Sequence, residues 1–535
     1  MPRGYLAIVL HAHLPFVRHP EYESFLEERW LYEAITETYI PLLRYLEQLV
    51  EDRVQSYVTV SLSPTLLFML EDPLLQERYD DHVGKLIALS ERELDRTRYD
   101  SHLNWLAGMY HDLFVRTREY FRRHDGRLSR PFLRLHELGA VELITTAATH
   151  GILPLLSGQP KTVEAQLGIG FEYFESILGF RPSGMWLPEC AYCPDLEQNL
   201  RHQKVRYVVL ESHGIDHAVP TPWCGVHAPV YTPSGVAAFG RDQGSTKEVW
   251  SARQGFPGDP DYREFYRDIG FDLDFDYIRS VMGLDVRAMT GIKYHRITGR
   301  TPHKGAYDPE AGRHKADLHA QTFLDRRAAH IDALATSAAA PPIIVAPFDA
   351  ELFGHWWFEG PQWLDYFIRK SVFDQDKYEL TTLDRYLDRH PVHLSASPGT
   401  STWGHGGYFD TWINGRVDWI YNHLTECAER MQELATVFTG AERPSSQAER
   451  ALNQCVRELL LAQSSDWPFI ISQGTSAQYA ERRVRDHVAR FHFLASSLES
   501  GRMDEESLRA LEYIDNLFPN ADYRVFAEPV AARPA

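Results

Sequence analysis

Short runs of Val, Ile, Leu and Ala recur along the chain, separated by stretches with helical periodicity. Clear examples are YLAIVL at residues 5–10, VRYVVLE at 205–211 and PPIIVAPF at 341–348. Apolar runs spaced by helices are typical of parallel strands that are joined by crossover helices and buried on both faces. About seven such units can be counted. We therefore expect an α/β fold built on an incomplete (β/α)7 barrel.

Two long tracts depart from this alternation. The charged tract at residues 70–137 has helical periodicity and is predicted to be a helical insertion. From residue 415 apolar residues recur every three and four positions, which predicts a C-terminal helical domain at 415–535. The barrel domain would then comprise residues 1–69 and 138–414. The remaining strands are expected at 56–62, 141–147, 183–188, 291–297 and 392–396.

Charge and composition narrow the classes of partner. The 535 residues carry a formal net charge of −19, which disfavours nucleic acid and anionic membrane surfaces as partners because both are polyanions. No apolar run reaches the roughly 18–20 residues that span a bilayer.

The cysteine count and the N-terminus bear on the cellular location. Five cysteines, an odd count in a long chain, do not suggest a disulfide framework. The N-terminus does not resemble a signal peptide, so we expect a cytoplasmic protein.

Polar side chains follow the predicted strands at the point where each strand ends. The set is His11, His13, His150, Glu189, Asp349, Glu351, Trp403 and Asp410. In a parallel barrel, functional groups gather at the carboxyl ends of the strands. If Glu189 and Asp349 both face the barrel mouth, two carboxyl groups from different strands converge on one cleft. A retaining glycosidase uses such a pair as nucleophile and general acid/base.

Aromatic side chains crowd the same strand ends. The stretch VAPFDAELFGHWWFEGP at 345–361 places His355, Trp356 and Trp357 directly after the two acids, and Trp186 stands beside Glu189. The apolar faces of sugar rings stack on indole, while their hydroxyls seek acids and histidines. These residues are therefore candidates for substrate binding.

Two other kinds of site are compatible with parts of the pattern. The His11-Ala12-His13 sequence also suggests a metal-dependent amidohydrolase, with His150, Lys293, His295 and Asp410 as further ligands, but that site would not explain the tryptophans. Cys190 and Cys193 form a C-x-x-C motif. Without a second such motif, a four-cysteine zinc site is excluded, and we interpret the pair as structural.

Five segments occur in the order of the signature regions of a known family. They are HAHLP (11–15), ATHGILP (148–154), WLPECAY (186–192), APFDAELFGHWW (346–357) and STWGHGGYFDTWIN (401–414). The chain thereby resembles glycoside hydrolase family 57, and in particular its subgroup of 1,4-alpha-glucan branching enzymes. The segment QSSDWPFI at 463–470, which contains Asp466, is also similar. The resemblance implies an incomplete (β/α)7 barrel, a helical C-terminal domain, a retaining mechanism and neither metal nor other cofactor.

The resemblance also implies roles for residues at matching positions. Glu189 would be the nucleophile and Asp349 the general acid/base. Substrate contacts would come from His11, His13, His150, Trp186, Glu351, His355, Trp356, Trp357, Trp403, Asp410 and Asp466. The substrate would be an alpha-glucan such as amylose, glycogen or a starch-like polymer. In a branching enzyme, the 6-hydroxyl of a second glucan displaces Glu189 and creates an alpha-1,6 link.

One segment bears on the outcome of the reaction. Branching enzymes of the family carry a tyrosine on a mobile loop that covers the site, and the nearest segment here has Ala237 and Ala238. Without an aromatic lid, water would compete for the intermediate, so an alpha-1,4-glucan hydrolase is the main alternative. A 4-alpha-glucanotransferase and a non-catalytic glucan-binding protein are further possibilities.

Overall fold

The computed structural model describes residues 2–251, 255–336, 340–440 and 444–528. Two sheets form its centre. The first is made of β1 (Gly4–Ala12), β2 (Val58–Leu62), β3 (Val141–Ile144), β8 (Ile343–Asp349) and β9 (Tyr378–Leu380), with the order β3-β2-β1-β8 and β9 also pairing with β1. The second, with the order β4-β5-β7-β6, contains β4 (Gly184–Met185), β5 (Tyr207–Leu210), β6 (Val230–Tyr231) and β7 (Ala237–Gly240). All pairings are parallel except that of β6 with β7.

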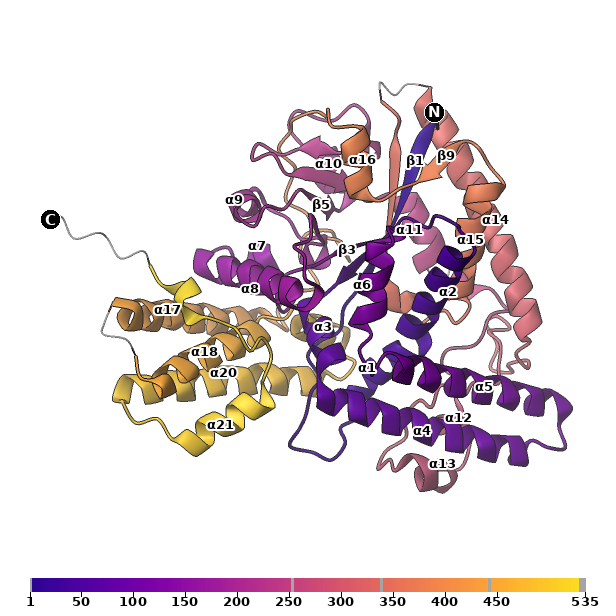
Figure 1. Ribbon diagram of the computed structural model, residues 1–535, viewed down its shortest axis with the longest axis horizontal. Helices are drawn as coiled ribbons and strands as arrows, with labels where there is room; N and C mark the ends of the chain where they lie inside the picture. The colour runs from indigo at the N-terminus through magenta and orange to yellow at the C-terminus, as the bar shows by residue number, and fades with distance from the viewer. Residues whose placement is uncertain (1, 252–254, 337–339, 441–443, 529–535) are drawn as a thin grey trace.

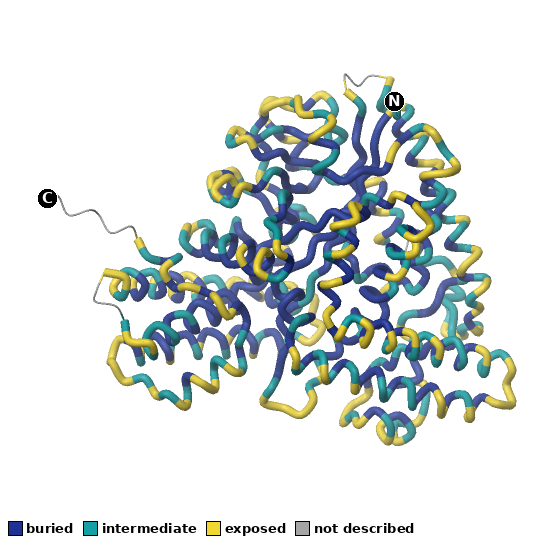
Figure 2. Tube along the Cα trace, in the orientation of Figure 1, coloured by how far each residue is buried: buried dark blue, intermediate teal, exposed yellow. Residues whose placement is uncertain are grey.

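The two sheets are connected at both ends. A parallel bridge between Thr145 and Met185 joins the end of β3 to β4. On the other side, the N–H of Asp242, just after β7, donates to the carbonyl of Val345 in β8 at 2.8 Å. Every residue of β1 is buried, as expected for a parallel strand covered on both faces. Figure 2 shows this buried centre in dark blue, surrounded by helices that are exposed on their outer sides.

Helices cover the sheets. Those that alternate with the strands are α1 (Glu28–Ala34), α2 (Ile40–Glu51), α3 (Pro64–Glu71), α7 (Leu153–Leu156), α8 (Pro160–Leu178), α9 (Glu197–His202), α10 (Ser212–Asp216), α11 (Gln243–Trp250), α12 (Ile269–Asp272), α13 (Phe275–Met282), α14 (Pro309–Ala335), α15 (Gly360–Phe373) and α16 (Leu383–Arg389). A π-helical turn, Ile35–Tyr39, connects α1 to α2. In the described residues, no helix combines the length and apolar character that a membrane span needs.

Two groups of helices lie on opposite flanks of the sheets (Figure 1). On one flank, α4 (Pro73–Arg96) and α5 (Ser101–Arg123) lie side by side, followed by α6 (Ser129–Glu137). Asp72 caps α4 by accepting from the Leu75 N–H, and Pro73 takes the first helical position. The other flank is a bundle of α17 (Asp418–Gly440), α18 (Ser446–Ala462), α19 (Asp466–Gln473), α20 (Ala477–Ser500) and α21 (Glu505–Ile514).

Two predicted strands are wrong. Residues 291–297 contain only isolated bridges, because their backbone groups bond to irregular segments instead of a sheet. The Glu264 N–H donates to the His295 carbonyl at 2.8 Å, and the Tyr307 N–H donates to the Tyr294 carbonyl at 2.9 Å. Residues 392–396 are an irregular segment with a single bridge, from Ser395 to Tyr231. The short strands β6, β7 and β9 were not predicted.

The expected position of the lid loop is also wrong. Ala237 and Ala238 are fully buried in β7, where they pair with Tyr207 and Val208 of β5. They therefore cannot be the tip of a mobile loop. The segment that leaves β7 toward the strand ends begins at Arg241 and continues into α11, which ends at Trp250.

Candidate active site

The predicted site lies where β1 and β8 end. His11 is the penultimate residue of β1, and Asp349 is the last residue of β8. The parallel register pairs these two residues directly. Glu189 follows β4 in a short turn, and His150 follows β3. The structure thus brings together polar residues from four strand ends.

Three histidines form a stack at the bottom of the site. The Nε2 atoms of His11 and His150 are 2.9 Å apart, so one of them donates to the other. The rings of His13 and His150 stack with centroids 4.0 Å apart, and His11 stacks on Trp186. Burial lowers the pKa of His11 and of His150 well below the usual histidine value, so both are neutral near pH 7. Neutral imidazoles can donate to and accept from sugar hydroxyls.

Serine hydroxyls and one carboxylate fix the outer nitrogens of these rings. The Nδ1 atoms of His11 and His13 lie 3.1 and 2.9 Å from the hydroxyls of Ser61 and Ser63 in and after β2. The Nε2 atom of His13 lies 3.0 Å from Asp466. These are positioning contacts of the kind that set ring orientation and tautomer.

Glu189 is held in an unusual backbone conformation. Its φ and ψ are 60° and 26°, and His150 and Cys190 also have positive φ. Left-handed backbone at non-glycine residues costs about 1–3 kcal/mol each and concentrates at functional sites. The turn aims the Glu189 carboxylate at Trp403, whose indole N–H donates to Oε2 at 2.5 Å. The hydroxyl of Ser465 donates to Oε1 at 3.4 Å, and Nδ1 of His150 lies 3.6 Å from the same oxygen.

Asp349 lies among cationic and donor groups. The charges of Arg241 and His13 and a hydrogen bond from the side chain of Trp250 lower its pKa, but burial outweighs them and raises the pKa to about 6. Arg241 also pairs with Glu211 at 3.1 Å and lies over the Trp403 ring, 5.8 Å from its centroid.

Glu351, the second acid of the segment, is held by two hydrogen-bond donors. Tyr39 donates to its Oε1 at 2.5 Å, and the His13 N–H donates to the same atom at 3.2 Å. Burial raises its pKa to about 8, with the charge of Asp349 as a further cause. Glu351 thus connects His13 to the π-helical turn, which suits an orienting role.

The two carboxyl groups of the predicted catalytic pair have pKa values on either side of 7. Burial, assisted by the charges of Asp349 and Asp466, raises the pKa of Glu189 to about 8, while the donors Trp403 and Ser465 act in the opposite direction. With the Asp349 value of about 6, the pair shares one proton near pH 7. One ionised and one protonated carboxyl is the state that a retaining glycosidase needs.

The C-terminal bundle contributes directly to the site. Ser465, between α18 and α19, places its hydroxyl 2.7 Å from Nδ1 of His150, and Asp466, the first residue of α19, binds Nε2 of His13. The Ser465 N–H also donates to the His150 carbonyl at 3.2 Å. Residues of the helical bundle therefore form one side of the site, and Ser465 lies 315 positions after His150 in the sequence.

The aromatic segment after β8 divides into exposed and buried residues. Gly354 has a φ of +110°, and a Cβ there would lie 1.7 Å from the Glu37 carbonyl, so only glycine allows this close approach to the π-helical turn. Trp356 is 53% exposed and stacks on Phe265 with centroids 4.4 Å apart. Trp357 is only 2% exposed and packs against Trp363, so its predicted role in substrate binding is wrong.

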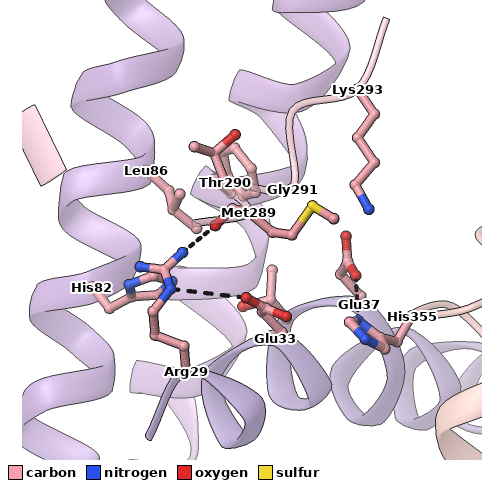
Figure 3. A pocket seen from close by; sticks show the side chains of 12 residues that line it. Arg29, Glu33, Glu37, His82, Leu86, Met289, Thr290, Gly291, Lys293 and His355 are labelled. Carbon is pink, nitrogen blue, oxygen red and sulfur yellow. Dashed lines mark hydrogen bonds and ion pairs between the residues drawn. The ribbon is translucent and has the colours of Figure 1, made fainter. Parts of the chain in front are cut away.

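Two more predicted residues lie apart from the carboxyl pair. His355 is bound to Glu37 at 2.8 Å in a neighbouring pocket, shown in Figure 3, where Arg29 and Lys293 also point inward. Lys293 donates to the Phe265 carbonyl at 2.7 Å and so takes no part with His11 and His13 in a metal site. Asp410 is exposed in the loop after Trp403, with its carboxylate against the backbone of Gly406.

Sequence reasoning missed four residues of the site: Arg241, Trp250, Tyr39 and Ser465. Arg241 precedes α11 and Trp250 is its last residue, in a region predicted to be irregular, and Tyr39 lies within the π-helical turn. The local sequence held no signal for Trp250, because its contact with Asp349 depends on how α11 packs against β8.

Known proteins resemble the chain over nearly its whole length. The family model for glycosyl hydrolase family 57 matches residues 7–393, and the model for the C-terminal region of 1,4-alpha-glucan branching enzymes matches residues 423–526. The 1,4-alpha-glucan branching enzyme TK1436 of Thermococcus kodakarensis is 32% identical over 558 residues, covering 96% of this chain and 77% of that protein.

Two crystal structures are similar in fold as well as sequence. AmyC of Thermotoga maritima, described as a novel alpha-amylase, is 43% identical, with a TM-score of 0.92 over 99% of this chain and 100% of that one. The branching enzyme of Pyrococcus horikoshii, described as GH57-type, is 32% identical, with a TM-score of 0.87 over 98% of this chain and 97% of that one.

Proposed function

Because the chain belongs to glycoside hydrolase family 57, we propose that it is a 1,4-alpha-glucan branching enzyme that acts by a retaining mechanism. The observation that carries the proposal is the convergence of Glu189, after β4, and Asp349, at the end of β8, beside His11, His150 and Trp403. Burial raises the pKa of both carboxyl groups, to about 8 for Glu189 and about 6 for Asp349. The match of residues 423–526 to the C-terminal region of branching enzymes supports transfer rather than hydrolysis.

In the proposed reaction Asp349 protonates the oxygen of an alpha-1,4 link while Glu189 attacks the anomeric carbon. The 6-hydroxyl of a second glucan then gives its proton to Asp349 and displaces Glu189, which leaves an alpha-1,6 branch. His11, His13 and His150 bind the hydroxyls of the donor sugar, and Trp403 forms the wall beside Glu189. Trp186 is fully buried and supports this wall by packing against Trp403.

In these roles Asp349 must carry the proton and Glu189 must be ionised when the reaction begins. In the empty site the higher pKa, about 8, belongs to Glu189, whereas the nucleophile must be ionised. A glucan that covers Asp349 removes its remaining contact with solvent and raises its pKa further, while the indole of Trp403 continues to favour the Glu189 carboxylate. Substrate binding is thus expected to move the proton to Asp349.

The proposal includes closure of the two sheets into one barrel. The bridge from Thr145 to Met185 and the bond from Asp242 to Val345 would close β1, β2, β3, β4, β5, β7 and β8 into the seven-stranded barrel expected from the sequence. The division into residues 1–69 with 138–414, 70–137 and 415–535 stays a prediction. So do the physiological polymer, either glycogen or a starch-like glucan, and the cytoplasmic location.

Alpha-1,4-glucan hydrolysis is the second candidate. It is favoured by the 43% identity to AmyC, which is described as an alpha-amylase. The same two carboxyl groups serve both reactions, and the outcome depends on whether water or a sugar hydroxyl reaches the glycosyl intermediate.

Incubation with amylose distinguishes the candidates. We would record alpha-1,6 linkages by proton NMR and new reducing ends in the same samples, with Glu189→Gln as the control. A branching enzyme gives alpha-1,6 signal with few reducing ends, and a hydrolase gives the reverse. Lengthened alpha-1,4 chains with neither product would indicate a 4-alpha-glucanotransferase. Binding without any turnover would leave only a glucan-binding protein, and full activity in the control would refute the carboxylate assignment.

A further inference from the structure

Two histidines and an aspartate meet beside helix α11, outside the residues described above for the carboxyl pair. His227 ends a 3-10 turn at Gly225–His227, Asp242 caps α11, and His330 lies near the end of α14. Their ligand atoms all lie within 4.8 Å of one another, although the three residues come from separate segments of the chain. The mechanism proposed above uses none of them.

The distances suit a shared ligand better than a direct hydrogen bond. Nε2 of His227 lies 3.4 Å from Oδ2 of Asp242, longer than the roughly 2.7–3.2 Å of a good N–H···O bond. Two ligands of a tetrahedral ion at about 2.0–2.1 Å stand about 3.3–3.4 Å apart. The rings of His227 and His330 meet edge to face, with centroids 4.8 Å apart.

The other oxygen of Asp242 is already fixed by the protein. Oδ1 accepts from the N–H and the hydroxyl of Ser245 at 2.7 and 2.5 Å, and Arg327 lies 3.6 Å from it. Metal-binding carboxylates are held by outer partners of this kind, which leave the second oxygen to face the ion. Arg327 also pairs with Glu248 at 3.1 Å, so its charge is shared between two acids.

We propose that His227, Asp242 and His330 bind a divalent transition-metal ion, for which Zn²⁺ fits best, with water in the fourth position. Two imidazoles and one carboxylate are a ligand set that Zn²⁺ commonly takes. The site is only partly exposed, so solvent can reach the open position.

A second group of potential ligands lacks these properties. Glu458, His487 and Asp515 also lie within 4.8 Å of one another, but all three are fully buried. Asp515 pairs with Arg490 at 2.5 Å, and Glu458 binds His487 at 2.8 Å. Guanidinium and imidazole already satisfy those carboxylates, so we interpret that group as an internal ion-pair network.

The proposed ion would fix helix α11 and thereby position two residues that contact or lie near Asp349. Asp242 follows Arg241, which lowers the pKa of Asp349, and begins the helix that ends at Trp250, whose side chain bonds to Asp349. An ion that ties Asp242 to His330 would hold α11 against α14. The role is positional, because the ligands are separate from the carboxyl pair.

Metal content provides the direct test. Tag-free protein stripped with a chelator is titrated with Zn²⁺ against a chromophoric competitor, and the bound metal is measured by mass spectrometry after dialysis. We expect about one equivalent per chain and a rise in Tm on binding, because a ligand of the folded state stabilises it. Co²⁺ in place of Zn²⁺ should give the visible absorption of a tetrahedral nitrogen–oxygen site.

Variants localise the ion. His330→Ala and His227→Ala should weaken Zn²⁺ binding by more than the roughly 10–100-fold that loss of an outer partner costs. His314→Ala removes an exposed histidine from the same helix α14 and should bind like the parent. Less than about a tenth of an equivalent in the parent chain, or unchanged binding by His330→Ala, would overturn the proposal. Because the readout is metal content, this result is independent of the reaction that the carboxyl pair performs.

Discussion

The indole N–H of Trp403 donates to Oε2 of Glu189 at 2.5 Å, and the Trp403 N–H donates to the Glu189 carbonyl at 3.0 Å. The two residues are 214 positions apart in sequence and belong to different signature regions. Because the side-chain bond is made to a carboxylate, it favours the ionised form, and this form is the one in which Glu189 could attack a sugar.

Trp403→Phe should therefore slow the reaction. The substitution keeps an aromatic ring against Trp186 but removes the indole N–H that donates to Glu189. A hydrogen bond to a charged group is worth about 1.5–3 kcal/mol, so kcat/KM should fall by roughly 10–100-fold. Loss of the donor also raises the pKa of Glu189, so the pH–rate profile should move to higher pH. Initial rates across pH on a soluble maltooligosaccharide measure both effects. Trp412→Phe, a buried neighbour, is the control, and an unshifted profile would contradict the assigned contact.

The parent enzyme should have a bell-shaped pH–rate profile with its maximum near pH 7. The pKa values are about 8 for Glu189 and about 6 for Asp349. Below about pH 6 both carboxyls are protonated and no nucleophile is available. Above about pH 8 both are ionised and no acid remains. The measurement is kcat/KM against pH, with circular dichroism to confirm that the fold persists. Activity that keeps rising beyond pH 8 would show that the pair does not supply the acid.

The contact between His13 and Asp466 joins the strand ends to the C-terminal bundle. Asp466→Ala leaves the His13 ring, which is 9% exposed, without its acceptor, a loss of about 1–3 kcal/mol. We expect kcat to fall by about tenfold or more while Tm changes little, because the rest of the interface is intact. Asp466→Asn keeps an oxygen acceptor and should recover part of the rate.

Kinetics and melting of the two Asp466 variants provide the measurement. Glu433→Ala, which removes an exposed acid from α17 in the same bundle, is the matched control. If Asp466→Ala lowered Tm without changing kcat, the contact would serve the domain interface and not the site.

Much of the fold was predictable because six of the parallel strands are apolar runs in the sequence. The strand β7 was missed because its four residues, AAFG, lie between Gly- and Pro-rich segments and owe their strand conformation to pairing with β5. Conversely, apolar and polar residues alternate at 291–297 as they do in a strand, but Lys293 and Tyr294 are bonded to neighbouring segments and not to a strand. Tertiary partners outside the local sequence decided both cases.

The site was predictable where residues follow strands and not where they come from elsewhere. His11, Glu189 and Asp349 were identified from their positions at strand ends. Ser465 comes from the helical bundle, and its role depends on how that bundle packs against His150. Trp356 and Trp357 are adjacent and chemically alike, and no local pattern tells which one faces the core. The contact between Gly354 and Glu37 makes that choice.

The two adjacent tryptophans should therefore respond differently to truncation. Trp357→Ala empties a site that is 2% exposed among aromatic rings and should destabilise the fold by about 3–5 kcal/mol. Trp356→Ala removes a half-exposed ring stacked on Phe265, and the free energy of unfolding should change by about 1 kcal/mol or less. If Trp356 binds a glucan chain, its loss should raise KM for amylose about two- to tenfold, since an aromatic contact is worth about 0.5–1.5 kcal/mol.

Denaturant unfolding and KM for amylose, measured side by side on the two variants, distinguish these roles. KM for a short maltooligosaccharide is the internal control, because a ring outside the carboxyl pair should affect long chains more than short ones. An unchanged KM for amylose in Trp356→Ala would remove Trp356 from the substrate-binding set. An unchanged stability in Trp357→Ala would mean that the surrounding rings collapse into the cavity, which the close packing of Trp363 and Phe353 makes costly.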